Sequence, residues 1–151
     1  MYQLHTDPKH FSKLMELLSD SVRHPTDGDV YFNTFLARLN ATNEIITLAS
    51  STGQVYVKSK QMLYVHMAVT QPGAEMIAHL YHAVQRRIHE EWEAGKQPLG
   101  VTIKPTAIQV RFNYYQHSGI WLQAMSLQCH GIINNANQSY IVDLLHKAHT
   151  L

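Results

Sequence analysis

The chain is short of cysteine and of net charge, and each shortage removes a class of protein. Cys129 is the single cysteine among 151 residues, so no internal disulfide can form and a disulfide-stapled secreted scaffold is excluded. Charged residues make up 15% of the chain, and the formal net charge is only +1. That balance gives no strong field to attract nucleic acid or an anionic membrane. Eleven histidines make the protein more basic below about pH 6.

The chain also lacks a long hydrophobic segment and the features of an export signal. No run approaches the roughly 20 apolar residues of a membrane-spanning helix, and residues 1–10 lack the cationic and apolar regions of a signal peptide. We therefore expect a cytoplasmic protein that does not contact the membrane. With 45% apolar residues, the composition is that of a folded chain. Its length is typical of one domain, so residues 1–151 are predicted to form a single domain.

No catalytic motif is present in the sequence. It contains no Gly-x-Ser-x-Gly elbow, no phosphate-binding glycine loop and no paired zinc-binding cysteines. Cys129 and His130 are adjacent, but neighbouring residues of a strand point to opposite faces and cannot act together as nucleophile and base. We expect neither enzymatic activity nor a cofactor.

Histidines gather on one side of the long helix predicted after residue 73. His79 with His82, or His89 with Glu93, have spacings at which two side chains could reach one metal ion. A metal site needs a third and a fourth ligand, and none is indicated. The preferred interpretation is a solvated helix face without metal.

Residues 54–92 organise the predicted fold. Apolar residues occupy every second position in 54–58 and in 62–70, which predicts two half-buried strands. After the stop at Pro72-Gly73 the spacing changes to a period of 3.6, which predicts a long amphipathic helix ending before Gly95. Because both segments have one apolar side, we expect the helix to lie on the hairpin. The helical positions are Met76, Ile77, Leu80, Tyr81, Val84, Ile88 and Trp92.

Two helices are predicted before this hairpin. The first begins at Asp7-Pro8 and ends at His24-Pro25. Its apolar stripe is wider than one packing contact requires and consists of Phe11, Leu14, Met15, Leu17, Leu18 and Val22. Residues 29–40 fit a short helix or a buried extended run, and we prefer the helix.

The remaining segments complete an α+β fold. Residues 44–48, 107–115 and 120–129 read as strands, 134–137 as a loop and 140–148 as a final helix. The strand at 120–129 is apolar on both sides near its start, so it is predicted to be central or part of an interface. We expect a curved antiparallel sheet of five or six strands with helices packed on one face, in the order α-(α)-βββ-α-ββ(β)-α.

Two stretches carry a resemblance to a known family. One runs from Gln54 to Thr70 and through Pro72-Gly73 into the long helix. The other is Gly119-Ile120-Trp121-Leu122-Gln123, followed by a terminal helix with Tyr140, Leu144 and Leu145. This order of elements, in a chain of this length, resembles the class I type III secretion chaperones, and the invasion-type members come closest.

The resemblance implies a homodimer without enzymatic activity that holds an extended N-terminal region of a secreted effector. The first helix and the three predicted strands at 44–48, 54–58 and 62–70 would offer the partner-binding pockets, through Phe11, Leu14, Leu17, Leu18 and Tyr56. The later strands would form the dimer, with Trp121 as an aromatic anchor beside Ile120 and Tyr115.

An alternative hypothesis is a small nucleic-acid-binding protein. Arg86, Lys104 and Arg111 could hold phosphates, and the aromatic residues within 112–115 could stack on bases. Against this hypothesis, the charge of the chain is balanced and the alternation places at least half of the aromatic run in the core.

Overall fold

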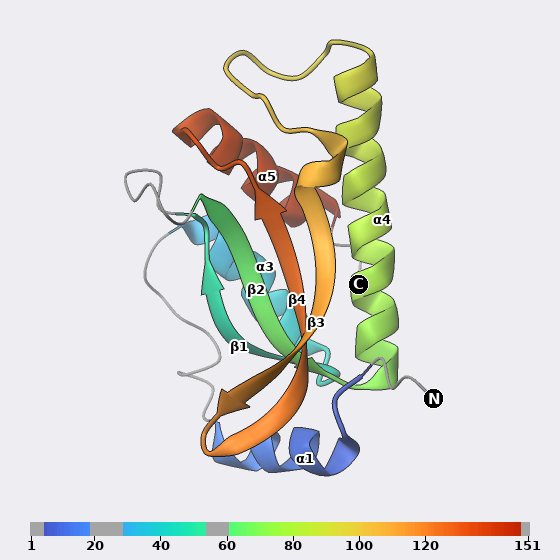
Figure 1. Ribbon diagram of the computed structural model, residues 1–151, viewed down its shortest axis with the longest axis vertical. Coiled ribbons are helices and arrows are strands. Elements are labelled where there is room, and N and C mark those ends of the chain that lie inside the picture. The colour runs from blue at the N-terminus through green and yellow to red at the C-terminus, as the bar shows by residue number, and fades with distance from the viewer. Residues whose placement is uncertain (1–4, 19–28, 54–60, 149–151) are drawn as a thin grey trace.

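A four-stranded antiparallel sheet is the centre of the computed structural model, which describes residues 5–18, 29–53 and 61–148 (Figure 1). The predicted α+β class is confirmed. In chain order the elements are α1 (Pro8–Leu17), α3 (Val30–Ala41), β1 (Ile45–Ser51), β2 (Met62–Val69), α4 (Gln71–Glu93), the 3-10 helix η1 (Pro105–Ala107), β3 (Ile108–His117), β4 (Ile120–His130) and α5 (Asn135–Ala148).

The strands lie in the order β1-β2-β4-β3, and every neighbouring pair is antiparallel. Two hairpins, β1–β2 and β3–β4, therefore meet through β2 and β4, with Val65 opposite Leu127 and Met67 opposite Met125. Each hairpin is followed by a helix, α4 or α5. The central position predicted for the strand at 120–129 is confirmed.

The prediction of five or six strands was wrong for the described residues, in which four strands form the sheet. β1 is longer than predicted because it continues to Ser51 through an irregularity between Thr47 and Ala49. β1 pairs directly with β2, and β4 pairs with the other edge of β2, so no strand lies between β1 and β2 in the sheet. The strand predicted at 54–58 lies outside the described residues.

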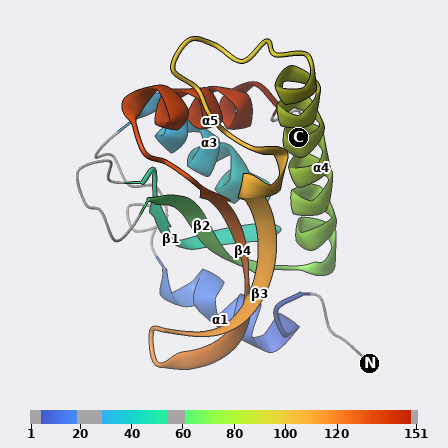
Figure 2. The same ribbon diagram turned by 45° about the horizontal axis from the view of Figure 1, so that its top comes forward.

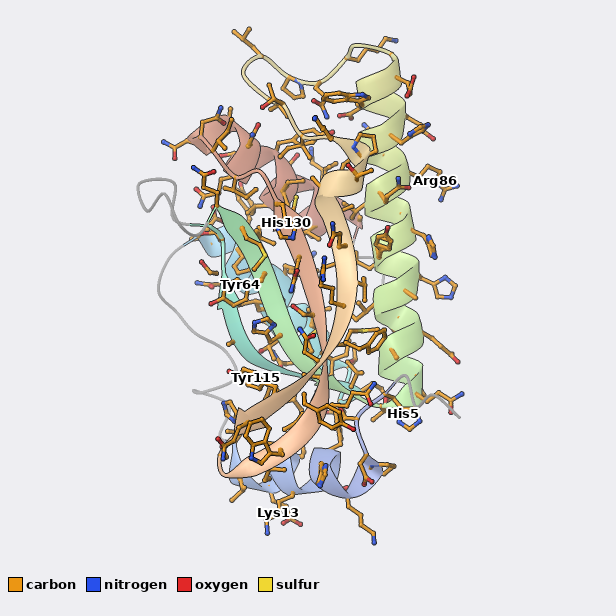
Figure 3. All side chains as sticks on the ribbon, in the orientation of Figure 1. His5, Lys13, Tyr64, Arg86, Tyr115 and His130 are labelled. Carbon is orange, nitrogen blue, oxygen red and sulfur yellow. The ribbon has the colours of Figure 1, made fainter. Side chains whose placement is uncertain are left out.

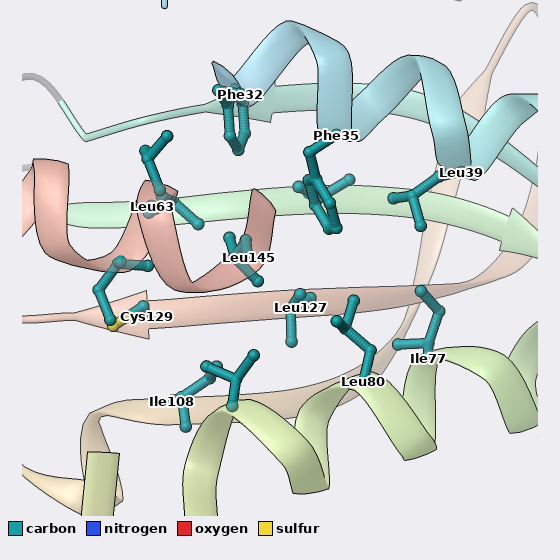
Figure 4. Packing of buried hydrophobic residues seen from close by; sticks show 14 of the residues in the cluster. Phe32, Phe35, Leu39, Leu63, Ile77, Leu80, Ile108, Leu127, Cys129 and Leu145 are labelled. Atoms are coloured by element: carbon teal, nitrogen blue, oxygen red, sulfur yellow. The ribbon is translucent and has the colours of Figure 1, made fainter. Parts of the chain in front are cut away.

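Helices α3, α4 and α5 cover one face of the sheet, and the main core lies between these helices and the sheet (Figure 4). Phe35 of α3, Leu80 of α4 and Leu145 of α5 meet Leu127 of β4 in this layer. Alternate residues of each strand supply the sheet side, as the period of two predicted. Each fully buried side chain of this size stabilises the fold by about 1.5–3 kcal/mol.

Helix α1 packs on the opposite face, so the prediction that all helices share one face was wrong (Figure 2). Phe11 and Leu14 contact a second apolar cluster on the sheet, made of Ile46, Ala68, Leu122 and Ala124. These strand residues alternate with the main-core residues, and leaving them uncovered would expose apolar surface to water. Thr6 fixes the approach to α1: its amide donates to Val69 O (2.9 Å) and its hydroxyl to Gln123 O (2.8 Å).

The helix predicted over 29–40 is confirmed as α3. Asp29 caps it, because its carboxylate accepts from the Phe32 amide at 3.1 Å. Near its other end the buried Asn40 side chain reaches β1, where Nδ2 donates to Thr47 Oγ1 (2.8 Å) and Oδ1 accepts from Thr47 N (3.0 Å). Asn40 thus provides hydrogen-bond partners for the buried amide and hydroxyl of Thr47, beside the irregularity in β1.

Two helix starts differ from the prediction. Pro72 and Gly73 lie inside the first turn of α4, where proline is tolerated, and Thr70 caps the helix by accepting from Gly73 N at 3.1 Å. α5 begins at Asn135, within the predicted loop, because Asn134 Oδ1 accepts from Asn137 N at 2.8 Å. α4 ends before Gly95, as predicted, and Gly95 has a φ of 65°.

Candidate protein interface

The β3–β4 hairpin is the longest continuous pairing in the sheet. It runs from Ile108 opposite Cys129 to His117 opposite Ile120. The two-residue turn has positive φ at Ser118 (53°) and at Gly119 (77°). Positive φ at both positions is the geometry whose twist suits a tight hairpin, so the two strands stay paired to their end.

This hairpin is almost free of charge. Between residues 108 and 130, Arg111 is the only charged side chain if histidine is counted as neutral. None of the four strands contains an aspartate, glutamate or lysine. Depletion of charge together with enrichment in aromatics distinguishes the centre of a protein interface from ordinary surface.

Large aromatic side chains lie exposed at the far end of the hairpin. Tyr114 is 77% exposed and Trp121 is 62% exposed. Tyr114 is opposite Gln123 and Trp121 is opposite Gln116, so the two aromatics are diagonal neighbours on the helix side of the sheet. In Figure 1 the hairpin continues past the start of α4 and ends beside α1. The aromatic pair therefore lies beyond the helices that cover the rest of that side.

The residues predicted to form a dimer are divided between the two faces of the sheet. Trp121 is exposed on the helix side. Ile120 and Tyr115 point to the other side and pack, half-buried, against the apolar cluster under α1. Trp121 is thus the member of this set that is available to another molecule, and its diagonal neighbour Tyr114 was missed. Strand alternation could have identified Tyr114. With a two-residue turn at 118–119, residues 114 and 121 lie on the same side of the hairpin.

The predicted partner-binding residues of α1 serve mainly the fold. Phe11 and Leu14 are buried against the sheet, and Leu18 is half-buried there. Leu17 is 52% exposed, while Tyr56 lies outside the described residues. The second sheet face largely explains the wide apolar stripe of α1 and leaves Leu17 as the exposed member among those stripe residues that the structure describes. The role of this set in binding a partner stays a prediction.

The basic residues of the nucleic-acid hypothesis are also separated. Arg86 lies on α4, on the helix side, and projects away from the sheet (Figure 3). Arg111 lies on the opposite sheet face, where its Nε donates to Gln109 Oε1 at 3.0 Å. Lys104 is exposed just before η1. Among the nearby aromatics, Tyr115 shares the side of Arg111 by strand alternation, while Phe112 and Tyr114 lie on the helix side of the sheet.

A row of rings crosses the sheet face that carries Arg111. Tyr64 stacks on His66 with centroids 4.6 Å apart, and Tyr115 lies 5.6 Å from His66. Figure 3 shows Tyr64 and Tyr115 on this face. His66 Nδ1 is 2.8 Å from Ser126 Oγ, and Gln128 Nε2 donates a hydrogen bond to the same Ser126 oxygen at 3.0 Å. Sequence reasoning missed this group because its members lie on three strands.

The His66–Ser126 contact has the composition of a base and a nucleophile, but its surroundings oppose that use. Ser126 is only 1% exposed in the middle of β4, so a substrate cannot reach its hydroxyl. Burial lowers the pKa of His66, which keeps the imidazole neutral at physiological pH. The pair acts as a satisfied polar contact between β2 and β4.

Other reactive groups show no assembled site in the described part of the chain. No three histidine, cysteine, aspartate or glutamate side chains come together there in a way that could hold a metal ion. Burial raises the pKa of the Cys129 thiol to about 12, so it stays protonated at neutral pH. None of the described helices has the length and apolarity to cross a membrane.

Comparison of the chain with protein-family models, with curated proteins and with solved structures gives no match.

Proposed function

We propose that the protein is a non-catalytic binding module for other polypeptides and that the β3–β4 hairpin is its docking element. One observation carries the proposal. Twenty-three consecutive residues, 108–130, contain a single charged side chain, and their far end exposes Trp121 and Tyr114. Aromatic side chains of this kind supply most of the binding energy at protein interfaces, whereas on an isolated surface they contribute little to the fold.

The outer edge of β3 supports the same proposal. β3 pairs with β4 on one side, and its other edge has no strand partner among the described residues. Folded proteins usually protect such an edge with lysine, proline or a bulge. β3 has ten residues without lysine or proline and pairs with β4 without a break in register. Where β3 continues past the start of α4 (Figure 1), an extended segment of another chain could therefore add to this edge through backbone hydrogen bonds.

The most specific form of the proposal is a cytoplasmic, homodimeric secretion chaperone that keeps the N-terminal region of an effector extended. This form depends on the resemblance of residues 54–73 and 119–145 to class I type III secretion chaperones. The β3–β4 hairpin is compatible with the chaperone form of the proposal, because dimerisation and the binding of an extended partner both need exposed surface with few charges.

Self-association is tested first, by size-exclusion chromatography with light scattering over a range of concentrations. We expect the wild-type chain to form a dimer and Trp121→Ser to shift it toward monomer. Trp92→Ser is the matched control, because Trp92 is exposed on α4, away from the hairpin. A wild-type monomer at every concentration, or equal effects of the two substitutions, contradicts dimerisation through the hairpin.

A single-tryptophan reporter locates the contact. In a Trp92→Phe variant, Trp121 is the only remaining tryptophan, so a shift of its emission to shorter wavelength on binding reports its burial. The variant is co-expressed with the product of the neighbouring gene, and hydrogen exchange is measured along β3. Protection of the β3 amides supports strand addition, and unchanged exchange contradicts it. Salt-dependent retention on heparin that Arg111→Gln abolishes would favour the nucleic-acid hypothesis instead.

A further inference from the structure

A groove of about 620 Å³ lies between the second half of α4 and α5. α5 runs toward α4, and the connection between α4 and η1 passes over it (Figure 2). Lys96 and Pro98 of that connection border the groove. Its size falls within the range of roughly 300–1,000 Å³ that is typical of ligand sites.

Both helices contribute apolar side chains, some of them small, to a lining that also contains charged residues. The apolar members are Ala83 and Val84 of α4 and Leu144 and Ala148 of α5. Small residues allow another helix to approach closely, and helices pack at interaxial distances of about 8–10 Å. The groove therefore suits a helix with one apolar side better than it suits a bulky irregular chain.

One carboxylate of the groove is occupied within the fold. Glu91 accepts from Tyr140 Oη at 2.6 Å and from Arg87 Nε at 2.8 Å. Desolvation raises the pKa of Glu91, but these two hydrogen bonds outweigh it and leave the pKa below its usual value. Glu91 therefore stays ionised and links α4 to α5 through Tyr140, and the positive charge of Arg87 beside it offsets its negative charge.

The remaining charges of the groove favour a negative partner. Lys147 pairs with Asp143 at 3.0 Å. Arg86 and Lys96 line the groove, and their side chains make no ion pair or hydrogen bond with any other described residue. Glu90 is the one acid of the lining without a salt bridge in the described chain. Among the described residues, the lining therefore contains two cations without a salt bridge, Arg86 and Lys96, and one such anion, Glu90.

We propose that this groove binds an acidic amphipathic helix of a partner protein. The apolar side of that helix packs between Ala83 and Ala148, and its flanking carboxylates pair with Arg86 and Lys96. Opposite charges at the rim set the orientation and speed the encounter, while the apolar contact supplies affinity. The site is separate from the β3–β4 hairpin and does not depend on the proposed function.

The test uses three labelled helical peptides of one length and fluorescence anisotropy with the full chain. The first carries an apolar stripe flanked by glutamates, the second has the same stripe flanked by lysines, and the third has the glutamate composition in scrambled order. We expect the first peptide to bind, with affinity that falls as salt rises, and the other two to bind at least tenfold more weakly.

Charge reversal then locates the site. Arg86→Glu combined with Lys96→Glu should weaken binding of the acidic peptide about tenfold or more and strengthen binding of the lysine peptide. Both positions are exposed, so the double variant keeps its core. Lys104→Glu with Arg111→Glu is the control pair, since neither residue lines the groove, and it should leave the preference for the acidic peptide intact.

A substitution in the groove wall separates shape from charge. Ala83→Gln fills the groove without changing a charge and should abolish peptide binding, whereas Trp121→Ser should leave it unchanged. The proposal is overturned if the acidic peptide fails to bind at low salt, if acidic and basic peptides bind equally, or if the control pair loses as much affinity as the groove pair.

Discussion

The two hairpins of the sheet are built alike but are covered differently. In β1–β2, no large hydrophobic side chain of the described strands is exposed, because helices pack on both faces of this part of the sheet. In β3–β4, the helix side of the half next to α4 is covered, while the far half exposes Tyr114 and Trp121. Apolar residues thus stabilise the fold in one hairpin and remain available for association in the other.

Leu127 and Trp121 give the sharpest form of this comparison. Both lie on the helix side of β4, but Leu127 is 1% exposed in the main core and Trp121 is 62% exposed. Leu127→Ala should lower the free energy of unfolding by about 2–5 kcal/mol through lost burial and a cavity. Trp121→Ala should change it by less than about 0.5 kcal/mol in dilute protein. Urea unfolding of both variants checks the contrast, and similar losses would mean that the hairpin end is part of the core.

Gly73→Ala should break the junction between the covered hairpin and α4. A Cβ atom at this position would lie 2.1 Å from Glu44 O, a backbone atom just before β1. The first turn of α4 must then move away from β1, at a cost of roughly 2–3 kcal/mol. Thermal unfolding measures this loss. Gln71→Ala, at an exposed position of the same turn, is the control and should have little effect.

Asn40→Ala should be destabilising by about 1–3 kcal/mol, because it leaves Thr47 N without its side-chain acceptor in a buried place. Asn113→Ala is the matched change in the exposed hairpin, where water replaces the lost amide, and it should be nearly neutral. Chemical unfolding of the two variants compares them. Equal losses would show that the exposed hairpin is as tightly constrained as the covered one.

The smallest expected effect is a pH dependence centred on His66. Burial places its folded-state pKa below the unfolded value near 6.5. The unfolded chain therefore takes up the proton first, so the stabilising contribution is complete above about pH 6.5 and is lost as the pH falls below it. Unfolding at pH 7.5 and at pH 5.5 should differ more for the wild type than for His66→Gln. If stability changes by the same amount between the two pH values in both proteins, His66 is not the cause of the pH dependence.

Local patterns predicted the elements better than their partners. The alternation over 62–70 and the period of 3.6 after residue 73 located β2 and α4, because each pattern depends on residues close together in the chain. The side of the sheet covered by α1, the pairing of β1 with β2 and the His66–Ser126 contact were not predictable in this way. Each depends on residues that meet across strands or layers, and a period gives no information about which surface lies opposite.

The candidate interface shows the same division. The sequence by itself determined that residues 108–130 form an aromatic-rich pair of strands with a single charged residue, Arg111, and with apolar residues on both sides of β4. Only the tertiary structure decided that Leu127 is covered and Trp121 is exposed. Both are apolar residues on the same side of β4, and each is buried only if a helix packs over it. Helices α4 and α5 pack over Leu127 but do not extend over Trp121.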